Sequence, residues 1–140
     1  MTSRPAATAA LGLAALALLA GCRSSSDGEL KTVVADGLAQ LHGPQDYERL
    51  RGRLLQTLTR LRSVNASPAG RKARLLAIRG FTATLRGVES RIAFVENDSG
   101  NLEAATRDTR LADRWLKAGA KLLRAAGREL GVQVGSLNGY

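Results

Sequence analysis

Apolar residues recur at alternating spacings of three and four along most of this 140-residue chain, and this pattern limits the fold more than any other feature. Such spacing places side chains on one face of an α-helix, whereas a half-buried strand requires alternation at every second residue. No segment sustains that second pattern. The longest helical run consists of Ile78, Phe81, Leu85, Val88, Ile92 and Val95. We therefore expect helices that each bury one apolar face, and no β-sheet.

Two shorter runs precede this one and are separated from it by turn signals. The first run consists of Leu30, Val33, Val34, Leu38 and Leu41. The second consists of Tyr47, Leu50, Leu54, Leu58 and Leu61. Ser26–Glu29 matches a capping box, in which a serine and a glutamate satisfy backbone N–H groups at a helix start. Gly43-Pro44 and Ser67-Pro68 interrupt the pattern, and each proline suits the first position of the helix that follows.

A last helix is predicted after the turn 97–100, from about Asn101 to about Leu130. Its apolar face would contain Ala112, Trp115, Leu116, Gly119, Leu122, Leu123, Ala126 and Leu130. In the preceding helix, Gly80 and Gly87 each cost about 1 kcal/mol relative to alanine. Close contact with a neighbouring helix is the physical reason that we expect for these two glycines.

Short connections between the predicted helices make sequence neighbours antiparallel in space. We therefore predict an all-α fold, a small up-and-down antiparallel bundle of three to four helices over residues 29–131. A flexible C-terminal tail would follow over residues 132–140. Phe81, Phe94 and Trp115 are the large side chains expected to fill a core of mainly leucine and alanine.

Lysine and arginine repeat along the last predicted helix at spacings of three and four. This basic stripe consists of Arg107, Arg110, Arg114, Lys117, Lys121, Arg124 and Arg128. It would be about 30 Å long at 1.5 Å per residue, and like charges at these spacings repel one another. Only Glu103 with Arg107 and Asp113 with Lys117 offer the favourable arrangement of an acid four residues before a base. Two interpretations stay open: a surface for an anionic partner, or a solvated face in a chain with 17 Arg against 4 Lys.

The N-terminus carries an apolar run that is too short and too rich in alanine to span a membrane comfortably. Arg4 precedes this run over Ala6–Ala20, and Leu19, Ala20 and Gly21 lead directly to Cys22, the single cysteine. This segment resembles the signal peptide and lipobox of bacterial lipoproteins. The resemblance implies cleavage after Gly21, so that residues 1–21 are a signal peptide and residues 22–28 are a lipidated cysteine with a short tether.

The same resemblance implies a covalent lipid and a location. Cys22 would carry a thioether-linked diacylglycerol and an acylated amine, with no other cofactor, and would anchor the chain in the cell envelope. Because Arg23 rather than aspartate follows the anchor, the sorting rule for such lipoproteins implies the periplasmic face of the outer membrane in a two-membrane bacterium. In a single-membrane bacterium the chain would stay on the outer leaflet of the cytoplasmic membrane. Cleavage removes one cation, Arg4, and leaves a mature net charge near +8, which favours anionic partners.

The remaining residues offer little for catalysis. His42 is the single histidine and lies in a Leu-His-Gly-Pro turn, where we expect a loop residue near a helix C-terminus. One histidine and an acylated cysteine are a poor set of metal ligands. Glu89, Glu96 and Asp98 could cluster, but we expect them to form salt bridges with Arg91 or with the last helix. The sequence thus predicts no catalytic residues, no metal site and a protein that is not an enzyme.

Two functions agree with these features. The first is a membrane-anchored, non-catalytic scaffold or protein-interaction module, in which a groove between helices or the face with Arg79 and Arg86 receives an envelope protein. The alternative is direct binding of anionic lipid, lipopolysaccharide or wall polymer by the basic stripe. A basic helix could also follow nucleic-acid phosphates, but the expected compartment argues against that partner. Ionic strength separates the two functions, because only binding by the stripe should weaken steeply with added salt.

Overall fold

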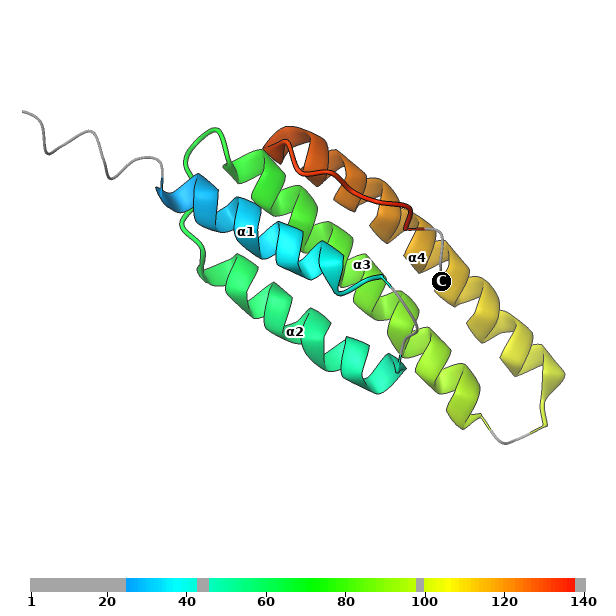
Figure 1. The fold of residues 1–140 in the computed structure, drawn as a ribbon. Helices are drawn as coiled ribbons and strands as arrows, with labels where there is room; N and C mark the ends of the chain where they lie inside the picture. Colours follow the sequence, from blue (N-terminus) through cyan, green and yellow to red (C-terminus); the bar gives the residue numbers. More distant parts are fainter. Residues whose placement is uncertain (1–24, 43–45, 98–99, 138–140) are drawn as a thin grey trace, which may run out of the picture.

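The computed structural model describes residues 25–42, 46–97 and 100–137, and in these ranges the chain is helical without any strand. Consecutive helices run in opposite directions (Figure 1), which confirms the predicted all-α bundle. The predicted cleavage residues Leu19, Ala20 and Gly21 and the predicted lipid site Cys22 lie outside the described residues. The four helices are α1 (Ser25–Ala39), α2 (Tyr47–Ser63), α3 (Arg71–Glu96) and α4 (Leu102–Leu130).

The core uses the apolar faces that the spacing predicts. Both short runs are buried, with Leu41 in the turn just after α1, and the exception is Tyr47, which is half-buried against the core. Phe81 of α3 is 0% exposed, and its ring packs against Gly37 of α1, where an added Cβ would lie 2.6 Å from the phenylalanine Cζ. On α4, the predicted apolar face is buried or half-buried throughout. α3 is the central helix, because it packs against α2 on one side and α4 on the other.

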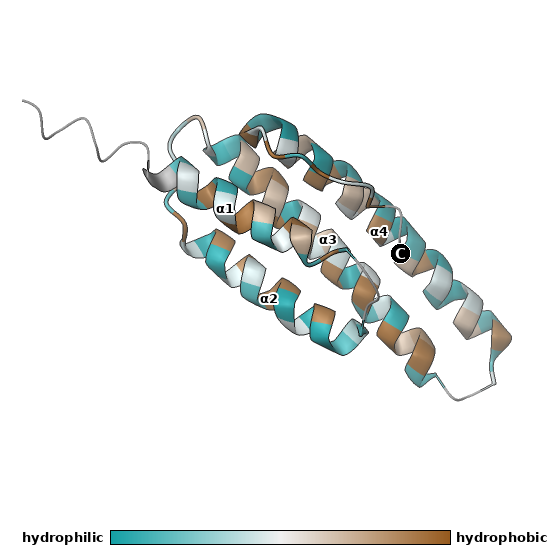
Figure 2. Cartoon of the chain, viewed as in Figure 1, coloured by the Kyte–Doolittle hydropathy of each residue, from teal (hydrophilic) through white to brown (hydrophobic). Residues whose placement is uncertain are grey.

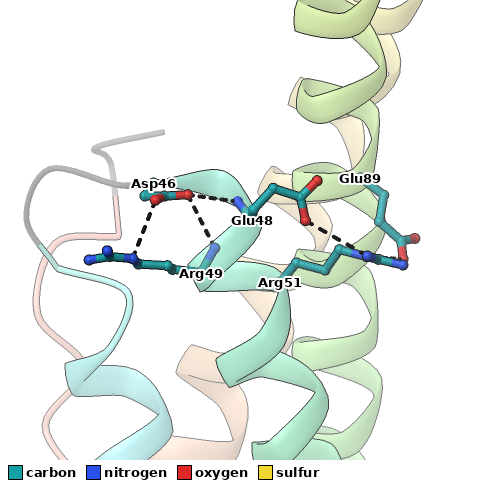
Figure 3. A network of polar contacts seen from close by, with 5 residues as sticks. All are labelled: Asp46, Glu48, Arg49, Arg51 and Glu89. Carbon is teal, nitrogen blue, oxygen red and sulfur yellow. Dashed lines mark hydrogen bonds and ion pairs between the residues drawn. The ribbon is translucent and has the colours of Figure 1, made fainter.

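The start of α2 differs from the sequence-based prediction. The helix begins at Tyr47, and the side chain of Asp46 accepts hydrogen bonds from the backbone N–H groups of Glu48 at 3.1 Å and Arg49 at 3.2 Å (Figure 3). Asp46 is therefore the N-cap, and Pro44, predicted at the first helical position, lies outside the described residues. The start of α1 is also two residues earlier than predicted, since a Ser26 N-cap would make Asp27 the first helical residue whereas the helix already includes Ser25.

Ser67 caps a helical turn that leads into α3. Its hydroxyl oxygen accepts from the Gly70 N–H at 3.0 Å, and its carbonyl oxygen accepts from the Arg71 N–H at 3.0 Å. Since α3 begins only at Arg71 with Gly70 as its N-cap, the prediction that Ser67 caps this helix and Pro68 occupies its first position is wrong, and Ser67 caps the turn before it instead. Ser67 also donates to Asp27 of α1 through both its hydroxyl and its backbone N–H, the latter at 3.0 Å. This contact fixes the α2–α3 connection to the first turns of α1.

α3 and α4 approach each other through small residues. A Cβ added at Gly80 would lie 2.8 Å from Leu123 Cγ, and one added at Gly87 would lie 2.6 Å from Leu116 Cγ. On the facing helix, an added Cβ at Gly119 would lie 3.0 Å from the Thr84 backbone nitrogen. Since these distances leave no room for a methyl group, the expectation that Gly80 and Gly87 mark a close helix contact is confirmed.

The α3–α4 hairpin extends past the ends of α1 and α2 (Figure 1). Arg51 of α2 pairs with Glu89 of α3 at 3.6 Å, and α2 begins only one turn before Arg51. Val95 lies almost two turns beyond Glu89, so α2 does not reach it, and its side chain is 69% exposed. The predicted apolar run of α3 is therefore buried or half-buried from Ile78 to Ile92 but wrong at Val95, and Phe94, 39% exposed, is not the core residue expected.

The segment after α4 also differs from the expected flexible tail. Gly131 ends the helix in the left-handed conformation with φ of 63°, and the Val132 N–H donates to the Gly127 carbonyl at 2.9 Å. The chain then returns alongside α4 (Figure 1), with Val134 packed on Gly127 and Leu137 only 5% exposed. As far as residue 137, this segment contacts the bundle and contributes to its core.

Candidate binding surface on the last helix

All residues of the basic stripe are exposed on one side of α4. The buried residues Ala112, Leu116, Gly119 and Leu123 face α3, and at 100° per residue the stripe lies on the opposite side of the helix. Figure 2 shows α4 as a helix with mixed hydrophilic and hydrophobic bands, as this two-sided pattern requires. The side of α4 that faces solvent thus presents a line of cations about 30 Å long.

Most of these cations have no ionic partner within the described ranges. Arg107, Arg110, Arg114, Lys117, Lys121 and Arg128 make no hydrogen bond or ion pair with any described residue. The acid-first pairs suggested by the sequence do not form there. Asp113 instead pairs with Arg91 of α3 at 2.7 Å, and Glu129 pairs with Lys72 of α3 at 2.7 Å. These two acids of α4 are therefore engaged toward α3, which leaves the outer side dominated by positive charge.

Apolar side chains accompany the first half of the stripe. Leu102 is 80% exposed and Leu111 is 40% exposed. Together with Arg107, Arg110 and Arg114 they line a hollow of about 810 Å³, whose other described lining residues are Glu103 and Thr106. All of these residues belong to α4, so the hollow is an open depression of the surface. Sequence analysis missed the exposure of Leu102 and Leu111, because the apolar pattern does not say where the neighbouring helix ends.

The end of α3 forms a second exposed apolar surface. We define the overhang as Phe94, Val95 and Leu102, the exposed large apolar residues on either side of the α3–α4 turn. Figure 2 shows hydrophobic colouring on both arms of this turn. The sequence could have indicated the overhang, because the apolar run on α3 is longer than the run on α2 that covers it. The α3 run continues to Val95, whereas the antiparallel α2 run begins at Tyr47.

Glu89 and Glu96, considered for an acidic cluster, both belong to α3, and Glu89 pairs with a cation of α2. Arg51 of α2 lies between Glu48, at 3.8 Å, and Glu89 of α3, at 3.6 Å (Figure 3). These residues line a hollow of about 310 Å³ that also includes Glu96. The prediction that Glu89 pairs with Arg91 or the last helix is wrong, because its partner comes from α2. Asp98 lies outside the described residues.

The face with Arg79 and Arg86 is less open than the sequence suggested. The Arg86 guanidinium lies over the ring of Trp115, with 4.8 Å from its central carbon to the ring centroid. A cation over an aromatic face is stabilised by the ring quadrupole, so Arg86 holds α3 against α4. Trp115 is half-buried at this edge and only partly serves as the core residue expected.

The other residues considered for chemistry lie apart from one another. His42 is exposed in the loop after α1, as predicted. Hydrogen bonds from the Ser67 hydroxyl and N–H lower the pKa of Asp27 below its ordinary value of 3.8. Within the ranges 25–42, 46–97 and 100–137, no three His, Cys, Asp or Glu side chains are placed to hold a metal ion.

Comparisons with known proteins give no indication of function, so the functional conclusion is based on the surfaces described above. No protein-family model matches the chain, and neither curated proteins nor solved structures include a match. Among the described helices, none combines the length and apolar character needed to cross a membrane.

Proposed function

We propose that this chain is a lipid-anchored module of the bacterial cell envelope that binds a protein partner and performs no catalysis. The observation that carries the binding role is the overhang, where Phe94, Val95 and Leu102 are exposed whereas the α3 run from Ile78 to Ile92 is buried or half-buried. Exposed apolar side chains that gather at one end of a fold mark interaction sites, and these three lie on either side of one helix–helix connection. The lipid anchor is supported by the lipobox resemblance at Leu19–Cys22.

The position of the overhang agrees with such a role. It lies at the end of the bundle opposite to the start of α1 (Figure 1). Cys22 precedes Ser25 by three residues, a separation that cannot exceed about 10 Å. A lipid on Cys22 would hold the start of α1 at the membrane and leave the far end of the hairpin accessible to a partner.

A groove between helices is a weaker candidate for the partner site. The space between α1, α2 and α3 is filled by buried leucine and valine side chains and by Phe81. Arg86, on the other face considered from the sequence, is stacked on Trp115. We therefore assign the protein-binding role to the overhang, where apolar surface is already exposed.

Mass spectrometry of the chain from its native host tests the anchor. We expect a mature N-terminus at Cys22 that carries diacylglycerol and an acylated amine. An uncleaved N-terminus with Met1 and an unmodified Cys22, or recovery of the chain in the cytosol, would contradict the anchored module.

Site-specific photo-crosslinking in the native host tests the overhang. A crosslinker at Val95 should capture one protein in stoichiometric yield, whereas a crosslinker at Leu55, 45% exposed on α2, should not. The substitution Val95→Asp should abolish association with the captured protein, and the matched substitution Leu55→Asp should preserve it. Equal capture from both positions, or capture of lipid alone, would contradict a protein site at the overhang.

A further inference from the structure

The unpaired cations of α4 require an explanation that the overhang does not supply. Like charges three and four residues apart destabilise a helix, and α4 keeps six exposed cations without an ionic partner in the described part of the chain. Cations near the C-terminal end gain from the helix dipole, which covers Arg128 but not Arg107, Arg110 and Arg114 in the first half. An external anionic surface would remove the repulsion along the whole stripe.

The nearest acidic side chains do not neutralise the stripe. Asp113 and Glu129 are held by Arg91 and Lys72 of α3. Glu103 is exposed in the first turn of α4 and is the described acid that shares the outer side with the cations. One carboxylate at one end of a line of seven cations leaves a strongly positive surface.

The chain enters the bundle beside the end of this stripe. Asp27, Gly28 and Lys31 of α1 and Glu129 and Leu130 of α4 line one hollow of about 320 Å³. The first turns of α1 therefore lie next to the last turn of α4, which carries Arg128. A lipid on Cys22 would hold this end of α4 at the membrane surface and raise the effective concentration of headgroups along the rest of the helix.

The apolar residues beside the cations suit a membrane interface. Leu102 and Leu111 lie on the two flanks of the stripe and contact the same hollow as Arg107, Arg110 and Arg114. Helices that lie on membranes combine lysine and arginine with neighbouring large apolar side chains that enter the boundary between headgroups and acyl chains. Leu102 would then contact lipid, and the protein partner would bind the α3 part of the overhang. Val95 lies two turns after Val88, on the side of α3 that carries the buried Phe81 and Val88, so it stays accessible when the stripe contacts lipid.

We propose that the outer side of α4 lies flat on the anionic phospholipid surface of the membrane that holds the Cys22 lipid, with the basic stripe against the headgroup phosphates. This inference rests on the anchor of the proposed function, but it does not depend on a protein partner. It also sets the orientation of the domain, because a flat α4 directs α2 and the covered side of α3 away from the membrane.

Spin labelling of the lipidated full chain in vesicles tests this orientation. The sulfur of Cys22 is occupied by lipid in this material, so a nitroxide can be attached at Thr106→Cys on the outer side of α4 or at Gln56→Cys on the exposed side of α2. The readout is collision of the label with a nickel chelate carried on lipid headgroups. In vesicles that contain phosphatidylglycerol at low salt, we expect frequent collisions for position 106 and few for position 56. In phosphatidylcholine vesicles, or at high salt, position 106 should lose this contact.

Two quadruple variants provide the matched comparison. Arg107, Arg110, Arg114 and Arg128 are changed to glutamine in the first, and Arg53, Arg62, Arg71 and Arg79 in the second. Both variants lose four exposed arginines, but only the first loses them from the stripe. The first variant should reduce the ratio of domains with α4 on the membrane to domains with α4 away from it roughly 100-fold or more. The second variant should change this ratio little. Circular dichroism of both variants confirms that α4 remains helical.

Three results would overturn the proposal. The first is a label at position 106 that never meets the headgroup chelate, the second is contact that is equal in both kinds of vesicle, and the third is an equal response of the two quadruple variants. Contact that appears only after lipopolysaccharide, wall polymer or an acidic protein is added would also overturn the phospholipid assignment. Failure to find lipid on native Cys22 is a separate result, since it removes the anchor of the proposed function, whereas these vesicle measurements use lipidated material.

Discussion

The two ends of the bundle differ in how completely the helices cover one another. At the near end, where α1 begins and α4 ends, Asp27 binds Ser67, Lys72 pairs with Glu129 and the segment after Gly131 packs back on α4. At the far end only α3 and α4 continue (Figure 1), and Val95 and Leu102 are exposed. Regions with many buried contacts resist local opening, and sparsely covered regions are available for binding. The near end therefore stabilises the fold, and the far end offers surface to partners.

Val88 and Val95 lie two turns apart on α3, and substitutions at these two positions should differ most in their effect on the free energy of unfolding. Val88→Ala should lower the free energy of unfolding by about 2 kcal/mol, because Val88 is 1% exposed and its loss leaves a cavity. Val95→Ala should change it by less than about 0.5 kcal/mol, as is usual for exposed positions. Urea denaturation of the two variants measures both values, and similar losses would show that the far end is covered.

Much of this contrast could be predicted from the sequence, but its boundary could not. The spacing of apolar residues identified the buried faces of α1 and α2 and the central part of α3, because burial of one face imposes that spacing directly. The same spacing continues to Val95, where the structure places no covering helix. Periodicity shows which face of a helix is apolar, but it does not show how far the neighbouring helix extends. Phe94 was assigned to the core because it is one of the few large side chains of the chain, and size alone does not say whether a neighbouring helix covers it.

The basic stripe was visible in the sequence, whereas its surroundings were not. Spacings of three and four placed the seven cations on one side of α4, as the structure shows. The partners of the acids depend on contacts between helices that local spacing cannot report, so Asp113–Arg91 and Glu89–Arg51 were missed. The return of the chain after Gly131 was also missed, because Val134 and Leu137 are too few to form a recognisable periodic pattern.

A pair of glycines tests the contact that holds the first half of α4 to the bundle. Gly87→Ala should lower the free energy of unfolding by about 1 kcal/mol, because overpacking against Leu116 outweighs the gain in helix propensity. Gly52→Ala on α2 should raise it by up to about 1 kcal/mol, since nothing lies within 4 Å of an added Cβ there. Thermal or urea denaturation measures whether each substitution raises or lowers the free energy of unfolding. A stabilising Gly87→Ala would show that α3 and α4 are less closely packed than the structure indicates.

The smallest expected effect concerns the contact of Asp27 with Ser67 at the near end, and it depends on pH. The Ser67 hydroxyl and N–H hold the pKa of Asp27 below its ordinary value of 3.8, so the ionised carboxylate is favoured in the folded state. The resulting stabilisation is present above pH 3.8 and is lost as the pH falls through the lower pKa of the folded state. Asp27→Asn should therefore lower Tm at neutral pH, and the difference from the unsubstituted chain should diminish in acid.

A double-mutant cycle assigns this effect to the contact itself. Ser67→Ala should lower Tm in the same direction as Asp27→Asn, and the double variant should lose less than the sum of the two, because each single change already removes the shared hydrogen bond. Additive losses, or a Tm difference that persists unchanged in acid, would mean that Asp27 does not hold the α2–α3 connection. The stability of the near end would then depend on Lys72 with Glu129 and on the segment that follows Gly131.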